Sequence, residues 1–202
     1  MNATNIVVML IENQEAFEGF KQTLANFSWQ NPYGLLCITN DKDLYLPIRE
    51  YLDSLMLLGE KETLVIYEQK SFLTFNDVKQ YINHATNLIL WDSRIPISST
   101  GIRTLMEAYT IHFSAGLITG GGNTNEEICF NIDDIYAKEV SASGIKDTKD
   151  RFIDIDTLTK GTLITKYYGL FIDFDFDNHS IYEYGIELRK LGYKNYYDKE
   201  VK

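Results

Sequence analysis

The sequence has few cysteines, few prolines and no long hydrophobic run, and each scarcity excludes a class of protein. Its 202 residues include only 2 Cys and 3 Pro. Cys37 and Cys129 lie in apolar runs, which favours buried, reduced thiols over a disulfide, and neither has a histidine at metal-site spacing. The apolar run at 5–11 is short and follows no basic start. We therefore expect a soluble cytoplasmic protein with neither a signal peptide nor a transmembrane segment.

Positive charge is also scarce. The chain carries 19 Lys and Arg against 29 Asp and Glu, a formal net charge of −10. This balance argues against a protein that coats nucleic acid, so we expect no nucleic-acid partner. A small anionic ligand is still compatible with it, because a few local cations or helix N-termini suffice to bind one.

The first half alternates between apolar runs and helical patterns. Buried strands are predicted at 5–11, 34–40, 62–68 and 87–93, and helices at 13–29, 44–59, 75–85 and 101–113. This order predicts an α/β protein with a mostly parallel sheet and helices on both faces. We expect Pro47 near the start of its helix, and Asn76 or Asp77 as a helix cap.

The second half is more varied. A strand leads into Gly120-Gly121-Gly122, and one or two further strands are expected within 126–140. The run at 152–158 alternates as a half-exposed strand, 162–171 holds a short helix, and a helix capped by Gly192 precedes a final strand. No repeat or linker separates the halves, so we expect a single domain over 1–202.

In an open parallel sheet, ligands bind beyond the carboxyl ends of the strands. Polar residues follow several predicted strands at this edge: Glu12, Asn13, Asn40, Asp41, Glu68, Asp92 and Arg94. Asn40 and Asp41 suit the edge of a nucleobase or a ribose hydroxyl, although Asn and Asp also favour turns.

Asp92-Ser93-Arg94 follows the apolar strand "NLILW". An ionised Asp92 suits a ribose hydroxyl or a hard cation, and Arg94 suits the oxygens of a diphosphate. The alternative is an Asp92–Arg94 ion pair that closes the strand end. Trp91 should point away from Asp92 and toward the core.

These segments resemble glycosyltransferases of the GT-A type, especially family 2. The stretch "NLILWDSRIPISSTGIRTLMEAYTIHFSAGLITGGG" resembles the central segment of that class, in which a strand ends in a metal-binding Asp-x-Asp. The stretch "TKYYGLFIDFDFDNHSIYEYGIELRKLGYKNYYD" is similar to its closing element. The resemblance covers most of the chain. It implies a GT-A-like domain with a nucleotide-binding half at 1–95, an acceptor-side half at 96–202, and Mn or Mg as cofactor.

The sequence departs from the family pattern at the site itself. The second metal-binding Asp of the motif falls on Arg94, which leaves Asp92 as the metal ligand. The Glu-Asp pair that often supplies the catalytic base falls on Ser180 and Ile181. Glu183 matches the next acidic position of the same helix. A preplaced guanidinium can neutralise a leaving diphosphate as a cation does, so the pattern predicts weak or no metal dependence.

A base is still required for an inverting transfer. Glu183 is the preferred candidate. Asp175 is the second, because Asp173, Asp175 and Asp177 would share one side of an extended segment; His179 is a further option.

The sequence thus predicts transfer of a hexose from a nucleotide-sugar donor to an unidentified glycan, protein or lipid acceptor. The alternative is a catalytically inactive GT-A-like binding or scaffold protein, which would also explain the altered motif. A nucleotidyltransferase is disfavoured, because "LIENQEAFEGFK" lacks the expected glycine-rich loop with Arg and Lys.

Overall fold

The computed structural model describes residues 5–25, 33–55, 63–82, 87–91, 99–120, 127–130, 138–141, 149–158, 163–165 and 168–201. In the first half, strands and helices alternate as predicted: β1 (Asn5–Leu10), α1 (Gln14–Ala25), β2 (Tyr33–Thr39), α2 (Lys42–Ser54), β3 (Thr63–Tyr67), α3 (Asn76–Lys79) and β4 (Asn87–Trp91). These four strands pair in parallel in the order β3-β2-β1-β4.

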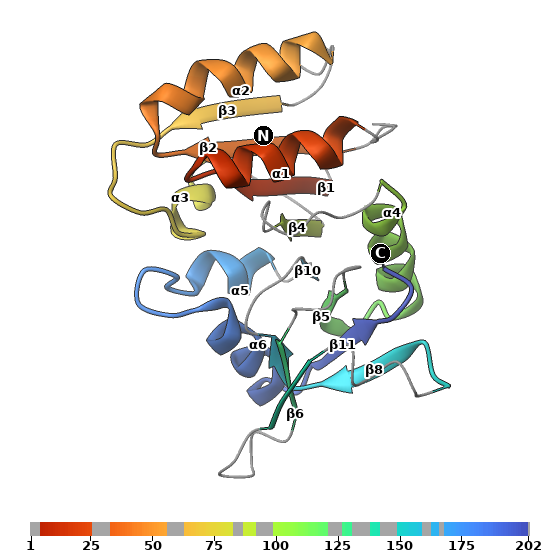
Figure 1. Cartoon of the computed structure of the whole chain (residues 1–202). Helices are drawn as coiled ribbons and strands as arrows, with labels where there is room; N and C mark the ends of the chain where they lie inside the picture. Colours follow the sequence, from red (N-terminus) through yellow and green to blue (C-terminus); the bar gives the residue numbers. More distant parts are fainter. Residues whose placement is uncertain are drawn as a thin grey trace.

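The second half extends the same sheet. Its elements are α4 (Ser99–Ile111), β5 (Ala115–Thr119), β6 (Glu127–Phe130), β7 (Lys138–Ser141), β8 (Phe152–Ile155), β9 (Thr157–Leu158), β10 (Leu163–Thr165), α5 (Tyr168–Asp173), α6 (Ile181–Lys190) and β11 (Lys194–Asp198). The eight-stranded sheet has the order β3-β2-β1-β4-β10-β5-β11-β8 (Figure 1). β10 lies antiparallel between β4 and β5, and β11 is parallel to β5. A small second sheet has the order β7-β6-β9.

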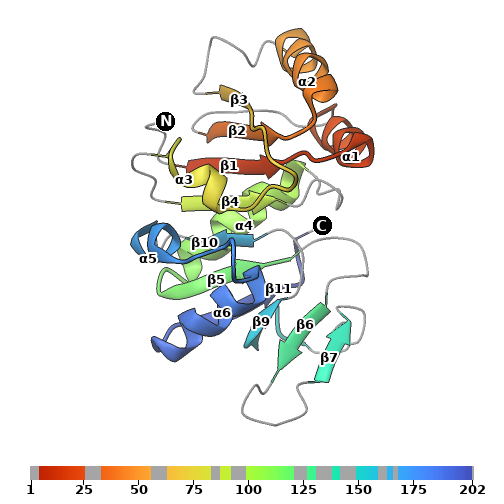
Figure 2. The same ribbon diagram turned by 90° about the vertical axis from the view of Figure 1, so that its left-hand side faces the viewer.

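Helices cover both faces of the large sheet, because successive strand residues point to opposite sides. In β1, Val7 and Met9 belong to the core under α1, α2 and α4. Ile6 and Val8 belong to the core under α3, α5 and α6. Figure 2 shows α3, α5 and α6 in front of the sheet and α4 behind it. The mostly parallel sheet flanked by helices confirms the predicted fold class.

Three local predictions are confirmed. Cys37 is a free, buried thiol, and burial raises its pKa. Trp91 is 1% exposed and packs in the core. Gly192 ends α6 with φ 90°, and the backbone N–H groups of Gly192 and Tyr193 donate to the carbonyls of Arg189 and Leu188. This is the glycine-dependent helix end that the sequence predicts. The side chain of Cys129 lies outside the described residues.

Other local predictions are wrong. Pro47 lies inside α2 rather than in its first turn. α3 has four residues, and Phe75 precedes it without a side-chain cap. Asn76 and Asp77 instead bond to other segments, as described below.

The helices were compared with the length and hydropathy of membrane-spanning segments. Within the described ranges, none of them combines the length and the apolar character needed to cross a bilayer.

Candidate functional site

Polar side chains at the carboxyl ends of the first three strands mostly accept hydrogen bonds from nearby segments of the chain. Asn13 Oδ1 accepts a hydrogen bond from Ala16 N at 2.9 Å and so caps α1. Glu12 Oε1 accepts one from Leu73 N at 3.0 Å. Beyond β3, Glu68 accepts hydrogen bonds from the Tyr81 hydroxyl and the Gln80 amide. These contacts fix the segment between β3 and α3 against the edge of the sheet.

Asn40 and Asp41 follow β2, as predicted. Asp41 is the N-cap of α2, and its Oδ1 accepts a hydrogen bond from Asp43 N at 2.9 Å. Asn40 Nδ2 donates to the Lys70 carbonyl at 3.3 Å. The turn role weighed from the sequence is therefore present. Asp41 Oδ2 and Asn40 Oδ1 have no hydrogen-bond partner among the described residues, so each retains an acceptor for a ligand.

Asp92 and Arg94 lie outside the described residues. The last described residue of β4 is Trp91, which pairs with Met9 of β1 in the sheet register. The roles predicted for Asp92 and Arg94 therefore stay predictions.

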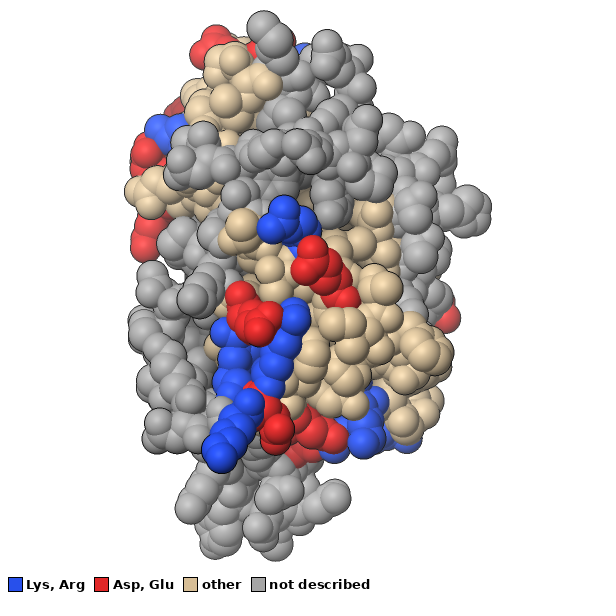
Figure 3. Space-filling model, turned by 90° about the vertical axis from the view of Figure 1, so that its right-hand side faces the viewer, with Lys and Arg blue, Asp and Glu red and all other residues tan. Residues whose placement is uncertain are grey.

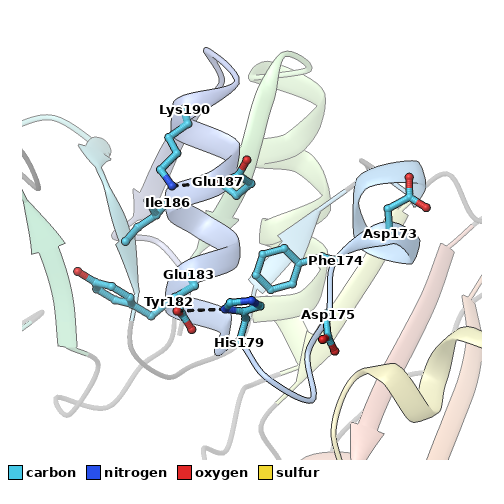
Figure 4. Close-up of a pocket in the computed structure, with 9 residues that line it drawn as sticks. All are labelled: Asp173, Phe174, Asp175, His179, Tyr182, Glu183, Ile186, Glu187 and Lys190. Carbon is cyan, nitrogen blue, oxygen red and sulfur yellow. Dashed lines mark hydrogen bonds and ion pairs between the residues drawn. The ribbon is translucent and has the colours of Figure 1, made fainter.

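A hollow of about 670 Å³ lies between the segment that follows α5 and the outer face of α6 (Figure 4). We call it the α6 hollow. It is lined by Asp173, Phe174, Asp175, His179, Tyr182, Glu183, Ile186, Glu187 and Lys190. Both predicted bases, Glu183 and Asp175, thus share one concave surface with His179.

Glu183 is held by the start of α6. Ser180 is the N-cap; its side chain accepts a hydrogen bond from Glu183 N, while Ser180 N donates to Glu183 Oε2 at 2.7 Å. His179 Nδ1 lies 3.2 Å from Glu183 Oε1. The hydrogen bond from the Ser180 backbone, followed by that from His179, holds the pKa of Glu183 below its ordinary value. Glu183 therefore stays ionised near neutral pH and stabilises the helix start.

Asp175 is held by a turn instead of an extended strand. α5 ends at Asp173, and Asp175 carboxylate oxygens accept hydrogen bonds from Asn178 Nδ2 at 2.7 Å, Asn76 Nδ2 at 2.9 Å and Asp177 N at 3.1 Å. These bonds, with that from Asn178 the strongest, lower the pKa of Asp175 to about 2. The predicted alignment of three aspartates on one strand face is wrong, because the chain turns at this point.

Contacts between the α3 segment and this turn were not foreseen from the sequence. Asn76 donates to Asp175 and accepts from Phe176 N at 3.0 Å, and Thr74 Oγ1 donates to Asp177 Oδ1 at 2.6 Å. Lys79 Nζ donates to the Phe174 carbonyl. We call these contacts the α3–turn network.

The α3–turn network joins the two groups of candidate residues only indirectly. Asn40 bonds to Lys70, and Lys70 forms an ion pair with the buried Asp77 at the edge of the network. Among the contacts of the described residues, none connects Asn40 or Asp41 directly with Glu183.

The carboxyl end of β11 carries a second charged cluster. Arg151 binds both carboxylate oxygens of the fully buried Asp198, at 3.0 and 2.8 Å, and Glu200 at 2.8 Å. Asp198 forms a bond with Arg151 strong enough to raise the pKa of the guanidinium. Gly120 lies against this end, because a Cβ there would be 2.6 Å from the Asp198 carbonyl. Figure 3, a view from the right-hand side of Figure 1, shows basic and acidic side chains interleaved on the surface.

A metal site is not formed by the described side chains, since no three His, Cys, Asp or Glu residues among them are grouped to hold an ion. The predicted ligand, Asp92, is outside this set.

Comparison with known proteins identifies similar folds but no sequence family. No protein family matches the chain, and no curated protein is detectably similar to it in sequence. A mannosyltransferase from Pyrobaculum calidifontis, in complex with GDP-Man and Mn²⁺, has a TM-score of 0.67 at 8% identity; the match covers 100% of this chain and 56% of that chain. A 4-diphosphocytidyl-2C-methyl-D-erythritol synthase from Anaerococcus prevotii has a TM-score of 0.58 at 8% identity, over 98% of this chain and 88% of its own.

The likeness confirms a GT-A-like, Rossmann-like fold. This chain spans little more than half the length of the mannosyltransferase. At such low identity, residue roles and substrates do not follow from the likeness.

Proposed function

We propose that this chain binds a nucleotide-sugar donor and transfers its hexose to an acceptor. The observation that carries this proposal is the likeness of the whole chain to a mannosyltransferase structure that holds GDP-Man and Mn²⁺. The name of the diphosphocytidyl synthase also contains a nucleotide, which supports a nucleotide ligand for this fold. In such open sheets the ligand crevice lies at the carboxyl ends of the strands, where Asn40 Oδ1 and Asp41 Oδ2 accept no hydrogen bond from the described residues.

The proposed donor site combines residues that follow β2 and β4. Asn40 and Asp41 would contact the nucleoside, and Asp92 the ribose or a weakly held cation. Arg94 would bind the diphosphate, because its planar guanidinium matches two phosphate oxygens at once. As the bond to the sugar breaks, this fixed charge would stabilise the negative charge that develops on the leaving group.

The proposed metal requirement follows from the side chains that could bind a metal ion at this site. Asp92 offers one carboxylate, whereas the guanidinium of Arg94 repels a divalent cation. These two residues therefore fit Mn²⁺ or Mg²⁺ poorly, and we propose weak or no metal dependence.

Glu183 is the better proposed base of the two candidates. A general base works best when its pKa approaches the working pH, and Asp175 has a pKa of about 2. The pKa of Glu183 is also lowered, but no value near that of Asp175 is reached, and His179 Nδ1 at 3.2 Å orients the Glu183 carboxylate within the hollow. Glu183 would accept the proton of the acceptor hydroxyl as the new glycosidic bond forms.

The second candidate function is an inactive binding or scaffold protein. It is favoured by the bonds that occupy both carboxylates: Glu183 closes a capping box, and Asp175 anchors a turn. Such structural roles would keep these residues without any catalysis.

Calorimetric titration with a panel of UDP-, GDP-, CDP- and dTDP-sugars, in Mn²⁺ or in EDTA, tests the proposal. We expect one donor class to bind, with an affinity that changes little on chelation. Binding together with transfer or slow hydrolysis of the donor supports the enzyme. Binding without turnover of the sugar supports the inactive binding protein, and failure of every donor to bind removes the enzyme and leaves the scaffold protein.

A further inference from the structure

The α6 hollow is large enough for a small ligand, and its walls combine rings with carboxylates. Its volume of about 670 Å³ falls in the range of ligand pockets. Phe174 and Tyr182 lie on either side of the Glu183–His179 pair in Figure 4. The Phe174 ring is held by edge contacts with Phe176 at 4.8 Å and Tyr184 at 5.2 Å. Rigid rings beside hydrogen-bond acceptors suit a sugar, whose ring has an apolar face and a polar rim.

The charge of the hollow excludes an anion. Four carboxylates line it against the single ammonium group of Lys190, an excess of three acidic over basic side chains among the lining residues. Lys190 itself lies 3.3 Å from Glu187. Behind the wall, Lys79 of the α3–turn network lies near Asp175, Asp177 and Asp173 and offsets part of this charge. A diphosphate donor or a phosphorylated acceptor would therefore be repelled from this surface.

Most of this charge is fixed by the fold. The hydrogen bonds to Asp175 and Glu183 favour their ionised forms and lower both pKa values. Asp173 makes no hydrogen bond or ion pair with any described residue, so its carboxylate is available to a ligand. The hollow thus presents negative charge before any ligand arrives.

We infer that the α6 hollow is the acceptor subsite and that it takes a sugar bearing a protonated amino group. This inference rests on the proposed function, which requires an acceptor beside Glu183. The rings would cover the apolar face of the sugar, while Asp173 and Glu187 would bind its ammonium and hydroxyl groups. Glu183 would face the hydroxyl that is to be glycosylated.

Three trisaccharides of different charge test this inference: cationic β-1,4-linked glucosamine, its neutral N-acetylated counterpart and anionic trigalacturonate. Titration in the absence of donor should give binding of the glucosamine probe about tenfold tighter than of the neutral one at low salt, with a smaller gap at high salt. Trigalacturonate should not bind. Equal binding of the charged and neutral probes, tighter binding of trigalacturonate, or no binding by any of them would overturn the inference.

Variants locate the binding surface. Asp173→Asn and Glu187→Gln should each weaken glucosamine binding about two- to fivefold, the effect of one exposed ion pair. Tyr182→Ala should weaken binding of both the glucosamine and the N-acetylated probe. The matched control is Glu107→Gln on α4, which removes the same charge from an exposed pair with Arg103.

The Glu107→Gln control distinguishes a specific binding site from general attraction of a cation to an acidic protein. Losses as large in Glu107→Gln as in Glu187→Gln would show general attraction and refute the subsite. Donor binding is measured independently: a donor that binds while the hollow variants leave the probes unaffected refutes the subsite alone. Failure of every donor refutes the proposed function.

Discussion

At the level of single residues, the chemistry of the side chains predicted some of the candidate site residues from the sequence. Asn40 and Asp41 follow a strand, as their sequence position indicated, and they combine a turn role with one side-chain oxygen each that bonds to no described residue. Glu183 and Asp175 are the two predicted bases, and both line the α6 hollow. The bond between Asn76 and Asp175 could not be foreseen, because 99 residues separate them in the chain, whereas the Ser-x-x-Glu spacing of Ser180 and Glu183 is a local capping-box signal.

Arg94 is the residue on which the proposed donor site depends. Arg94→Ala should weaken binding of the nucleoside diphosphate by at least tenfold, because a charged bidentate contact to phosphate is lost. Binding of the free nucleoside should hardly change. Isothermal titration with both ligands measures the difference, and equal losses would assign Arg94 a structural role instead.

Asp175 should make stability depend on pH in the acid range. Its pKa of about 2 lies below the ordinary value of 3.8, so the folded state binds its proton less readily than the unfolded state. The stabilisation is present above the ordinary pKa and disappears as the pH falls through about 2. Asp175→Asn should therefore lower the free energy of unfolding at pH 7, with a difference from wild type that shrinks between pH 4 and about pH 2.

Denaturant titrations of both proteins across that range check the prediction. A difference that stays constant down to pH 2 would show that the side chain acts by packing and not by its charge.

Among the elements, those with a clear period were predictable. β1 to β4 are apolar and bounded by polar turns, and α6 has a glycine end signal. β10 was missed, because three residues within a segment expected to form a helix carry no period of their own. Its strand identity comes from its partners, β4 and β5, which lie far away in sequence. α3 was also predicted too long: after Lys79 the backbone closes tighter turns, in which Tyr81 N donates to the Val78 carbonyl and Ile82 N to the Lys79 carbonyl.

The contact between α6 and β9 depends on Gly185. A Cβ at this position would lie 2.2 Å from Thr157 Oγ1 and 2.9 Å from Thr157 Cβ. Thr157 is fully buried and donates to the Tyr182 carbonyl at 2.7 Å, so it has little freedom to move. Gly185→Ala should destabilise the protein by about 1–3 kcal/mol through overpacking.

Urea denaturation of the single and double variants tests this. In a Thr157→Gly background the same substitution should cost much less, because the obstructing atoms are gone. An unchanged cost would show that the contact is not the cause.

At the scale of the whole molecule, the alternation of strands and helices was enough to predict the fold class, but not the order of the last strands. The sequence predicted a continuous, mostly parallel sheet, and the structure adds antiparallel strands at β10 and at the β8 edge. The second, small sheet was expected only as one or two strands. Pairing between distant segments decides these features, and no local pattern reports it.

Asp198 ties the end of β11 to the β8 region. Asp198→Ala should lower the free energy of unfolding by about 3 kcal/mol, because it breaks a bidentate pair with a fully buried carboxylate. Glu200→Gln is the matched control, since it removes the exposed partner of the same Arg151 and should cost less than about 1 kcal/mol. Equal midpoints of urea unfolding for the two variants would contradict the prediction.

The position of β10 also constrains how the protein is made. β10 pairs with β4 and β5 on its two sides but follows both in the chain. A nascent chain on the ribosome can assemble β1 to β4 early, yet that sheet ends in a bare strand until Leu163–Thr165 has been synthesised. During this interval β4 offers unsatisfied backbone groups to any neighbouring chain. We therefore expect the growing polypeptide to be most prone to pairing with another chain through β4 before β10 is available.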